Sequence, residues 1–241
     1  MPSQLSDVAR RWTELGGSDP MWAALTCSGR GGHWNAEGFL RTGRAEIDDV
    51  LALLRRRGIE PTAGTALDFG CGPGRLTAAL AAGFTKVIGV DVSPTMLAKA
   101  REIVPAELAC RCEFVLNEGS DLARIPDASV DLVYTCRVLQ HMPPALSHRY
   151  IREFLRIAAP GAPVVFQIPA EPAIGAIGTA LRVLPAAVLD RLRRGMQMHG
   201  TMPAEITRLI AEAGGVTVSV EEDGSAGPRW RSYLYVARAK N

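Results

Sequence analysis

Three glycines within five residues mark the stretch of this chain that is best suited to hold a ligand. Gly70, Gly72 and Gly74 follow a short apolar run that predicts a buried strand, and from Arg75 the apolar residues have helical spacing. A loop with so few side chains turns sharply and brings its backbone N–H groups close to a ligand. The stretch therefore predicts a strand, a ligand-binding turn and a helix.

An acidic residue ends the next apolar run. Residues 86–90 predict a second buried strand, and Asp91 follows it directly. A carboxylate at the tip of that strand accepts two hydrogen bonds from a ribose diol. Together, the turn and the acid predict a nucleoside-containing ligand rather than a purely structural loop.

The glycine spacing argues against a dinucleotide. This turn is G-x-G-x-G, whereas the dinucleotide turn has its third glycine one residue later, and Pro73 lacks an N–H group that a pyrophosphate needs. Asp68 precedes the turn by two residues, and its carboxylate suits an ammonium group better than a phosphate. A ligand with an amino-acid end and a ribose fits both acids, and S-adenosylmethionine has that form.

The residues after the fourth predicted strand, 130–134, are the candidates for chemistry. Ligands of open parallel sheets bind beyond the carboxyl ends of the strands, so residues 136–142 are expected to line the site. His141 lies there and is the best-placed titratable group for accepting a proton from a hydroxyl or amine. The alternative is that His141 only caps the next helix or packs beneath a covering segment.

The elements that must position these residues have clear signals. A helix is predicted over residues 44–57, ended by Gly58, and Ser93-Pro94 marks the start of another. A last helix is predicted over residues 203–213. The strands predicted at 216–220 and 230–237 are joined by a short turn, so they form an antiparallel pair at one edge.

Asp68-Phe69-Gly70-Cys71-Gly72-Pro73-Gly74, together with Asp91, resembles the cofactor-binding core of class I S-adenosylmethionine-dependent methyltransferases of the small-molecule type. The resemblance runs from about Gly64 to Pro169. It implies a doubly wound α/β fold with a mostly parallel seven-stranded sheet whose last strand is antiparallel. It also implies S-adenosylmethionine as cofactor, S-adenosylhomocysteine as product and no metal.

The resemblance places cofactor contacts along the chain. The loop after the third strand, Glu118 to Asp121, is similar in position to the loop that lies along the adenine, although an acid-rich surface turn is the alternative. The implied cofactor residues are Asp68, Gly70, Cys71, Gly72, Gly74, Arg75, Asp91, Val92, Met96, Glu118, Gly119, Ser120, Asp121, Cys136, Arg137 and Val138.

A single methyltransferase domain of four segments is expected: a lid at 1–42, a cofactor-binding core at 43–169, a substrate cap at 170–202, and the C-terminal helix and strands at 203–241. Trp34 and Phe39 are expected to face the pocket if the first segment is a lid. Otherwise that segment packs on the outer helices. Gln140 and His141 are the expected substrate contacts, and His199 is a second, weaker candidate for catalysis.

Composition limits the partners. The net charge of +2 gives no general attraction for nucleic acid, and no apolar run is long enough for a membrane helix. Five cysteines without paired C-x-x-C spacing predict neither a disulfide framework nor a zinc site. These features predict a cytoplasmic monomer or homodimer that acts on a small molecule.

Methyl transfer from a sulfonium is a direct displacement, which explains the absence of any visible triad or metal cluster. The expected activity is methylation of an N, O or C nucleophile of a small, partly apolar metabolite, in a setting such as secondary metabolism. Two alternatives stay open: a non-catalytic module that binds S-adenosylmethionine or S-adenosylhomocysteine, and an NAD-dependent oxidoreductase.

Overall fold

A seven-stranded sheet forms the centre of the computed structural model, which describes residues 4–25, 34–173 and 198–240. The strand order is β3-β2-β1-β4-β5-β7-β6. β7 is antiparallel to β5 and β6, and the other neighbouring pairs are parallel, so the predicted fold class is confirmed. The strands are β1 (Thr65–Phe69), β2 (Lys86–Asp91), β3 (Cys112–Leu116), β4 (Leu132–Thr135), β5 (Pro163–Pro172), β6 (Gly215–Asp223) and β7 (Trp230–Ala239).

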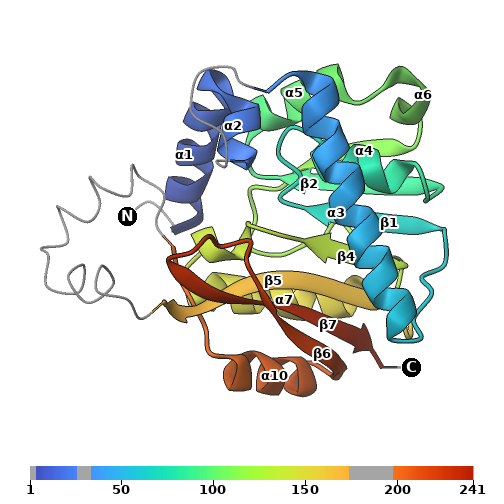
Figure 1. Cartoon of the computed structure of the whole chain (residues 1–241), viewed down its shortest axis with the longest axis vertical. Coiled ribbons are helices and arrows are strands. Elements are labelled where there is room, and N and C mark those ends of the chain that lie inside the picture. Colours follow the sequence, from blue (N-terminus) through green and yellow to red (C-terminus); the bar gives the residue numbers. More distant parts are fainter. Residues whose placement is uncertain (1–3, 26–33, 174–197, 241) are drawn as a thin grey trace, which may run out of the picture.

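Helices cover both faces of the sheet (Figure 1). They are α1 (Gln4–Ser18), α2 (Pro20–Ala24), α3 (Ala36–Arg56), α4 (Arg75–Ala81), α5 (Pro94–Ile103), α6 (Ala106–Ala109), the 3-10 turn η1 (Leu139–His141), α7 (Pro144–Ile157) and α10 (Pro203–Glu212). None of those in the described part of the chain is long and apolar enough to cross a membrane.

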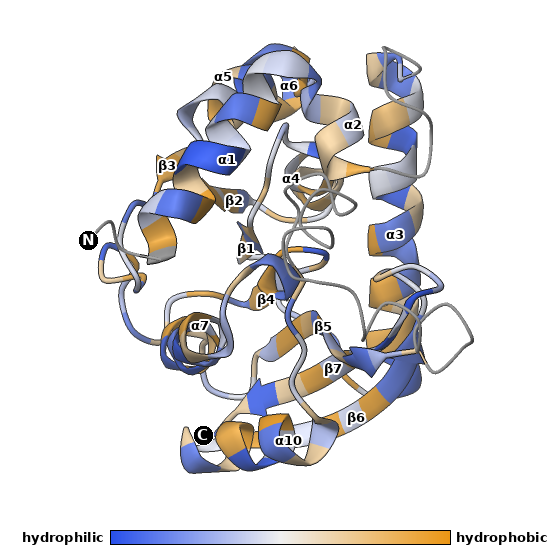
Figure 2. Cartoon of the chain, turned by 90° about the vertical axis from the view of Figure 1, so that its left-hand side faces the viewer, coloured by the Kyte–Doolittle hydropathy of each residue, from blue (hydrophilic) through white to orange (hydrophobic). Residues whose placement is uncertain are grey.

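Alternating side chains of β1 supply two separate cores. Leu67 and Phe69 pack with buried residues of α7 and α10, whereas Ala66 packs with α3 and α4 on the other face. This is the period of two that a strand covered on both faces requires. The covering helices α3 and α10 carry both hydrophobic and hydrophilic bands, as helices between a core and solvent do (Figure 2).

The start of α3 differs from the sequence prediction. The helix begins at Ala36, capped by Asn35, whose Oδ1 accepts the Gly38 N–H at 2.7 Å. The predicted start at Arg44 was wrong because the helix begins eight residues earlier and runs through Gly43, although glycine is a weak helix former. In the structure Gly43 lies where α3 crosses α4, and a Cβ atom there would lie 2.3 Å from the Arg75 carbonyl oxygen. The glycine allows close packing and does not end the helix.

The helix α5 begins where Ser93-Pro94 predicts a helix start. Ser93 caps the helix by accepting the Met96 N–H at 3.2 Å, and Pro94 occupies the first turn. This confirms the predicted helix start directly after the acidic end of β2. The cap also anchors the first helix of the chain, because the Ser93 hydroxyl donates to the Trp12 carbonyl at 3.3 Å.

Candidate active site

A cavity of about 580 Å³, here called the main cavity, lies beyond the carboxyl ends of β1, β2 and β4. Its walls come from the glycine-rich turn, the ends of these strands, α1, and the turn between β6 and β7. Open parallel sheets bind ligands at this position, and the volume is that of a typical small-molecule site.

The glycine-rich turn has the backbone that its composition predicts. Gly70, Gly72 and Gly74 have φ of +73°, +50° and +82°, a region that favours glycine. A Cβ atom on Gly70 would lie 2.3 Å from a methyl group of Val138. Side chains are therefore excluded both by conformation and by space, and the backbone itself forms this wall of the main cavity.

Asp91 lies at the end of β2 on the cavity wall. Its Oδ2 accepts the Gly72 N–H and its Oδ1 accepts the Ser93 N–H, both at 2.8 Å. Burial raises the pKa of Asp91 to about 6, and the N–H groups of Ser93 and Gly72 limit that rise. The carboxylate is fixed between the turn and α5, with lone pairs left for ribose hydroxyls.

Asp68 takes a different position from the one expected. Its side chain is fully buried, does not line the main cavity, and accepts the Thr77 hydroxyl at 2.6 Å through Oδ2. Its Oδ1 has no hydrogen-bond partner within the described residues. Burial raises the pKa of Asp68 to about 7, although the Thr77 hydroxyl opposes that rise. The structure thus places this acid behind the turn, in contact with α4.

The loop expected along the adenine reaches the main cavity through Asn117, one residue before the predicted range 118–121. Asn117 donates from Nδ2 to the Tyr150 hydroxyl at 3.2 Å, and that hydroxyl donates to the Gly119 carbonyl at 2.6 Å. Tyr150 also lines the cavity, so α7 holds the loop in place. None of Glu118, Gly119, Ser120 and Asp121 lies on the cavity wall.

A charged network that the sequence did not reveal lies beside the main cavity. Glu46 of α3 accepts hydrogen bonds from Arg75 Nη2 at 2.8 Å, Arg137 Nη1 at 3.0 Å and the Tyr134 hydroxyl at 2.9 Å. Burial acts to raise the pKa of Glu46, but Arg75 and Arg137 hold it below its ordinary value. The sequence offered one sign of this position: Glu46 lies one helical turn before Val50, and therefore on the buried face of α3.

Arg137 follows β4 in a conformation that is uncommon for a residue other than glycine. Its φ is +63°, and its backbone N–H donates to the Gln167 side chain at 3.0 Å. Arg137 lines the main cavity, and within the described chain its guanidinium makes one hydrogen bond, from Nη1 to Glu46. A guanidinium has five N–H donors, so most of this fork is available to an anionic ligand.

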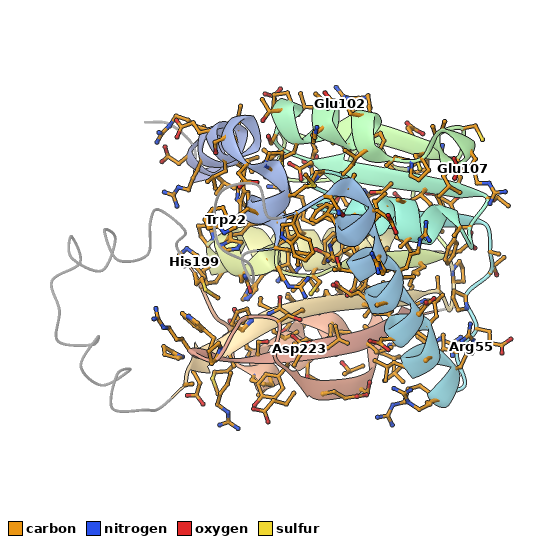
Figure 3. The ribbon with its side chains drawn as sticks, turned by 45° about the horizontal axis from the view of Figure 1, so that its top comes forward. Trp22, Arg55, Glu102, Glu107, His199 and Asp223 are labelled. Carbon is orange, nitrogen blue, oxygen red and sulfur yellow. The ribbon has the colours of Figure 1, made fainter. Side chains whose placement is uncertain are left out.

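His141 and Gln140 lie side by side on the cavity wall. Their side-chain nitrogens are 3.1 Å apart, and the Trp12 ring meets the His141 ring edge to face at 5.2 Å. The His199 N–H donates to the Gln140 carbonyl at 2.8 Å, although His199 does not line the cavity. Figure 3 shows His199 at the same end of the molecule as Trp22 of α2.

The N-terminal segment covers the main cavity with residues other than those expected. Leu5, Val8 and Trp12 of α1 line it, at the spacing of one helical face. Phe39 is fully buried and packs against the Trp34 ring at 6.0 Å, and neither residue lines the cavity. The spacing of three and four residues between Leu5, Val8 and Trp12 could have predicted from the sequence that α1 has an apolar face.

The turn between β6 and β7 is a second contribution that sequence analysis missed. Residues 224–228 line the main cavity although they lie far from the glycine-rich turn in sequence. Asp223 holds this turn by accepting the Ser225 N–H at 2.8 Å and the Ser225 hydroxyl at 3.0 Å. No local motif predicts this contact, because it depends on the order of strands in the sheet.

The structure brings most of the sequence-predicted site residues together. On the wall of the main cavity lie Gly70, Cys71, Gly72, Arg75, Asp91, Val92, Met96, Cys136, Arg137, Val138, Gln140 and His141. Gly74 lies just behind the wall, at the N-terminus of α4. Most of the predicted cap, residues 174–197, falls outside the described residues. Across the part that is described, no cluster of acidic, histidine or cysteine side chains could hold a metal ion.

Comparisons with known proteins identify the family of the chain. Residues 66–161 match a family model described as a methyltransferase domain. A trans-aconitate 2-methyltransferase from Methylobacterium radiotolerans is 33% identical over 192 residues, which cover 75% of this chain and 68% of that protein. Other curated trans-aconitate 2-methyltransferases match over only about half of their own length, 50% and 51% in two cases.

Solved structures share the fold at low sequence identity. The magnesium protoporphyrin IX methyltransferase ChlM from Synechocystis PCC 6803 with bound SAH has a TM-score of 0.67 and 19% identity, covering 97% of this chain and 98% of its own. The [4+2]-cyclase SpnF also has a TM-score of 0.67, with 18% identity and coverage of 99% and 97%. The shared fold therefore includes proteins with different reactions.

Proposed function

The chain belongs to the class I S-adenosylmethionine-dependent methyltransferases, and we propose that it methylates a carboxylate oxygen of a small organic acid. The observation that carries this proposal is Arg137. Arg137 lies two residues beyond the end of β4 and lines the main cavity, and within the described chain only one of its guanidinium N–H groups, on Nη1, is bonded, to Glu46. A planar fork of N–H donors matches a carboxylate. The relative from Methylobacterium radiotolerans, a trans-aconitate 2-methyltransferase, also supports an acid as acceptor.

The cofactor fits the residues present. The glycine cradle leaves room that a Cβ atom on Gly70 would fill, and Asp91 offers carboxylate lone pairs at the tip of β2. When bound, S-adenosylmethionine supplies a methyl group whose bond to sulfur breaks, with the electron pair staying on sulfur, as an acceptor lone pair forms the new bond. Asp91 would hold the ribose and the 70–74 backbone the methionine part.

The chain's own residues then have to align the acceptor and exclude water. Arg137 would orient the carboxylate beside the methyl group, and Glu46 would hold Arg137 in place at 3.0 Å. Trp12 and the other cavity-lining residues of α1 would cover the reacting atoms. A carboxylic acid is ionised at neutral pH, so this acceptor needs no general base. His141 stays a predicted base for the competing case of a hydroxyl or amine acceptor.

A turnover assay tests the proposal. The purified chain is incubated with S-adenosylmethionine and small acids, each beside its primary amide and alcohol, and S-adenosylhomocysteine release is measured. We expect turnover with acids only. The variant Arg137→Asn tests the anchor, because asparagine tolerates the positive φ at this position. The KM for the acceptor is expected to rise by roughly ten- to a hundredfold, since the variant loses charged hydrogen bonds to the carboxylate.

The controls separate this role from a loss of fold. Arg44 is an exposed arginine of α3 outside the cavity, and Arg44→Gln should leave KM unchanged. S-adenosylhomocysteine affinity should stay within a few-fold of wild type in Arg137→Asn. Turnover with the amides or alcohols but not the acids would refute the proposal, and binding of S-adenosylhomocysteine without any turnover would favour a non-catalytic module.

A further inference from the structure

A second hollow of about 500 Å³, here called the side recess, opens beside the main cavity. It is lined by one face of α3, by Tyr134 of β4 and by Leu234 of β7. The two hollows share Leu25, Arg75, Arg137 and Ser225. A ligand bound at Arg137 in the main cavity therefore lies next to the side recess.

One wall of the side recess is formed by α3. The α3 residues that line it recur at helical spacing: Thr42, Glu46, Asp49, Val50, Leu53 and Arg56. From Glu46 to Arg56 the helix rises by about 15 Å. Beyond that point, an ion pair between Arg57 and Glu221 at 2.9 Å ties the end of α3 to β6. Figure 1 shows α3 running across the strands toward this end of the sheet. The recess thus has a length that suits a chain-like group.

The charges around the side recess cancel. Three cations, Arg56, Arg75 and Arg137, stand against three carboxylates, Glu46, Asp49 and Asp223. The Glu46 carboxylate accepts bonds from both Arg75 and Arg137, and the Asp223 carboxylate accepts bonds from the hydroxyls of Ser225 and Ser232. The wall therefore has no excess positive charge for a second ionised carboxylate, which would lose its hydration without compensation.

The uncharged part of the wall is mostly apolar. It consists of Leu25, Thr42, Val50, Leu53, Tyr134, Ser225 and Leu234. Of these, Val50, Leu53 and Tyr134 belong to the core cluster under α3. A hydrocarbon group placed against this part of the wall is removed from water.

We propose that the side recess binds the apolar tail of the methyl acceptor. The preferred acceptor is then a monocarboxylic acid with a hydrocarbon chain, its carboxylate at Arg137 and its tail along α3, rather than a small polycarboxylic acid. This inference rests on the proposed function, because it takes Arg137 as the anchor of the carboxylate. The length of the recess makes chain length the variable to test.

Two adjacent residues of α3 give a matched pair of variants. Asp48 and Asp49 are both exposed, but only Asp49 lines the side recess. Asp49→Trp places an indole over the recess, whereas Asp48→Trp makes the same change of charge and size outside it. Neither residue belongs to the core, so both variants are expected to fold.

The probes are butanoate and decanoate. Wild type should use decanoate with a higher kcat/KM than butanoate by on the order of tenfold or more, since each buried methylene contributes about fourfold. Asp49→Trp should lose at least about tenfold with decanoate and keep butanoate within about twofold. Asp48→Trp should match wild type with both. Equal losses for both acids in Asp49→Trp, or no loss for either, would overturn the assignment.

A binding measurement separates this inference from the proposed function. Calorimetry with decanoate, at saturating S-adenosylhomocysteine, reports occupancy of the recess without turnover. If neither acid is methylated but decanoate binds wild type and Asp48→Trp at least about tenfold more tightly than Asp49→Trp, the recess assignment stands and carboxylate methylation fails. If decanoate binds all three proteins equally, or none of them, the recess assignment fails.

Discussion

At the scale of single residues, Asp68 gives the fold a pH dependence. Burial raises its pKa from an ordinary value of 3.8 to about 7. Between these values the folded protein keeps a proton that the unfolded chain has released, so the free energy of unfolding falls as pH rises. Near pH 7 half of the folded molecules hold a buried carboxylate, and about one pH unit higher the loss from this group is nearly complete.

Asp68→Asn should remove this dependence. The amide keeps an oxygen that accepts the Thr77 hydroxyl but cannot ionise. We expect the variant to exceed wild type in free energy of unfolding at pH 8 by up to about 4 kcal/mol, with a much smaller difference at pH 4. Urea denaturation at the two pH values measures this, with Asp48→Asn as the exposed control. A difference that is the same at both pH values would show that ionisation of Asp68 is not its cause.

At the scale of elements, α1 lines the main cavity and is fixed to the start of α5. The Ser93 hydroxyl donates to the Trp12 carbonyl at 3.3 Å, and the Thr95 hydroxyl donates to the Thr13 carbonyl at 2.9 Å. These bonds join the middle of α1 to the first turn of α5, next to Asp91. The Trp12 side chain is thereby set over the main cavity, in contact with His141.

Trp12→Ala and Trp34→Ala form a matched pair that tests which tryptophan covers the site. Trp12 lines the main cavity, whereas Trp34 packs on Phe39 and donates from Nε1 to the Leu25 carbonyl at 3.3 Å. We expect Trp12→Ala to weaken S-adenosylhomocysteine binding by about 1–3 kcal/mol in calorimetry, through lost apolar contact. Trp34→Ala should leave the affinity near wild type. The reverse order would support the lid originally predicted around Trp34.

Elements with a local signal were predictable from the sequence, and those shaped by tertiary contacts were less so. The Ser93-Pro94 cap and the antiparallel last strand follow from residues next to each other in the chain. The first turns of α3 could not be predicted in this way. Glycine is a weak helix former, and the reason for Gly43 in this helix is its close packing against Arg75. Local rules cannot supply that contact.

The same division holds for the site at the scale of the whole molecule. The glycine turn and Asp91 were identifiable because strand, turn and acid lie within one βαβ unit. Glu46 was not, because its bond to Arg137 joins residues 91 positions apart. The 224–228 turn lines the main cavity only because β7 inserts between β5 and β6. Such contributions are fixed by sheet order, which no single motif encodes.

Ligand-linked stability tests the whole assembly at once, because α1, the glycine turn, Asp91 and the β6–β7 turn belong to separate segments that only the folded chain brings together. A ligand that binds only the folded state, at a concentration a hundred times its Kd, adds about 2.7 kcal/mol to the free energy of unfolding.

For a chain of this size we expect S-adenosylhomocysteine to raise the Tm by about 5–10 °C, and NAD at the same concentration to leave it unchanged. We expect no shift with NAD because the G-x-G-x-G spacing differs from that of dinucleotide-binding turns, and because Pro73 lacks an N–H group for a pyrophosphate. A shift with NAD and none with S-adenosylhomocysteine would contradict the cofactor assignment. Because the fold is shared with a [4+2]-cyclase, a shift with S-adenosylhomocysteine establishes the cofactor site, and the acid panel is still required to establish methyl transfer.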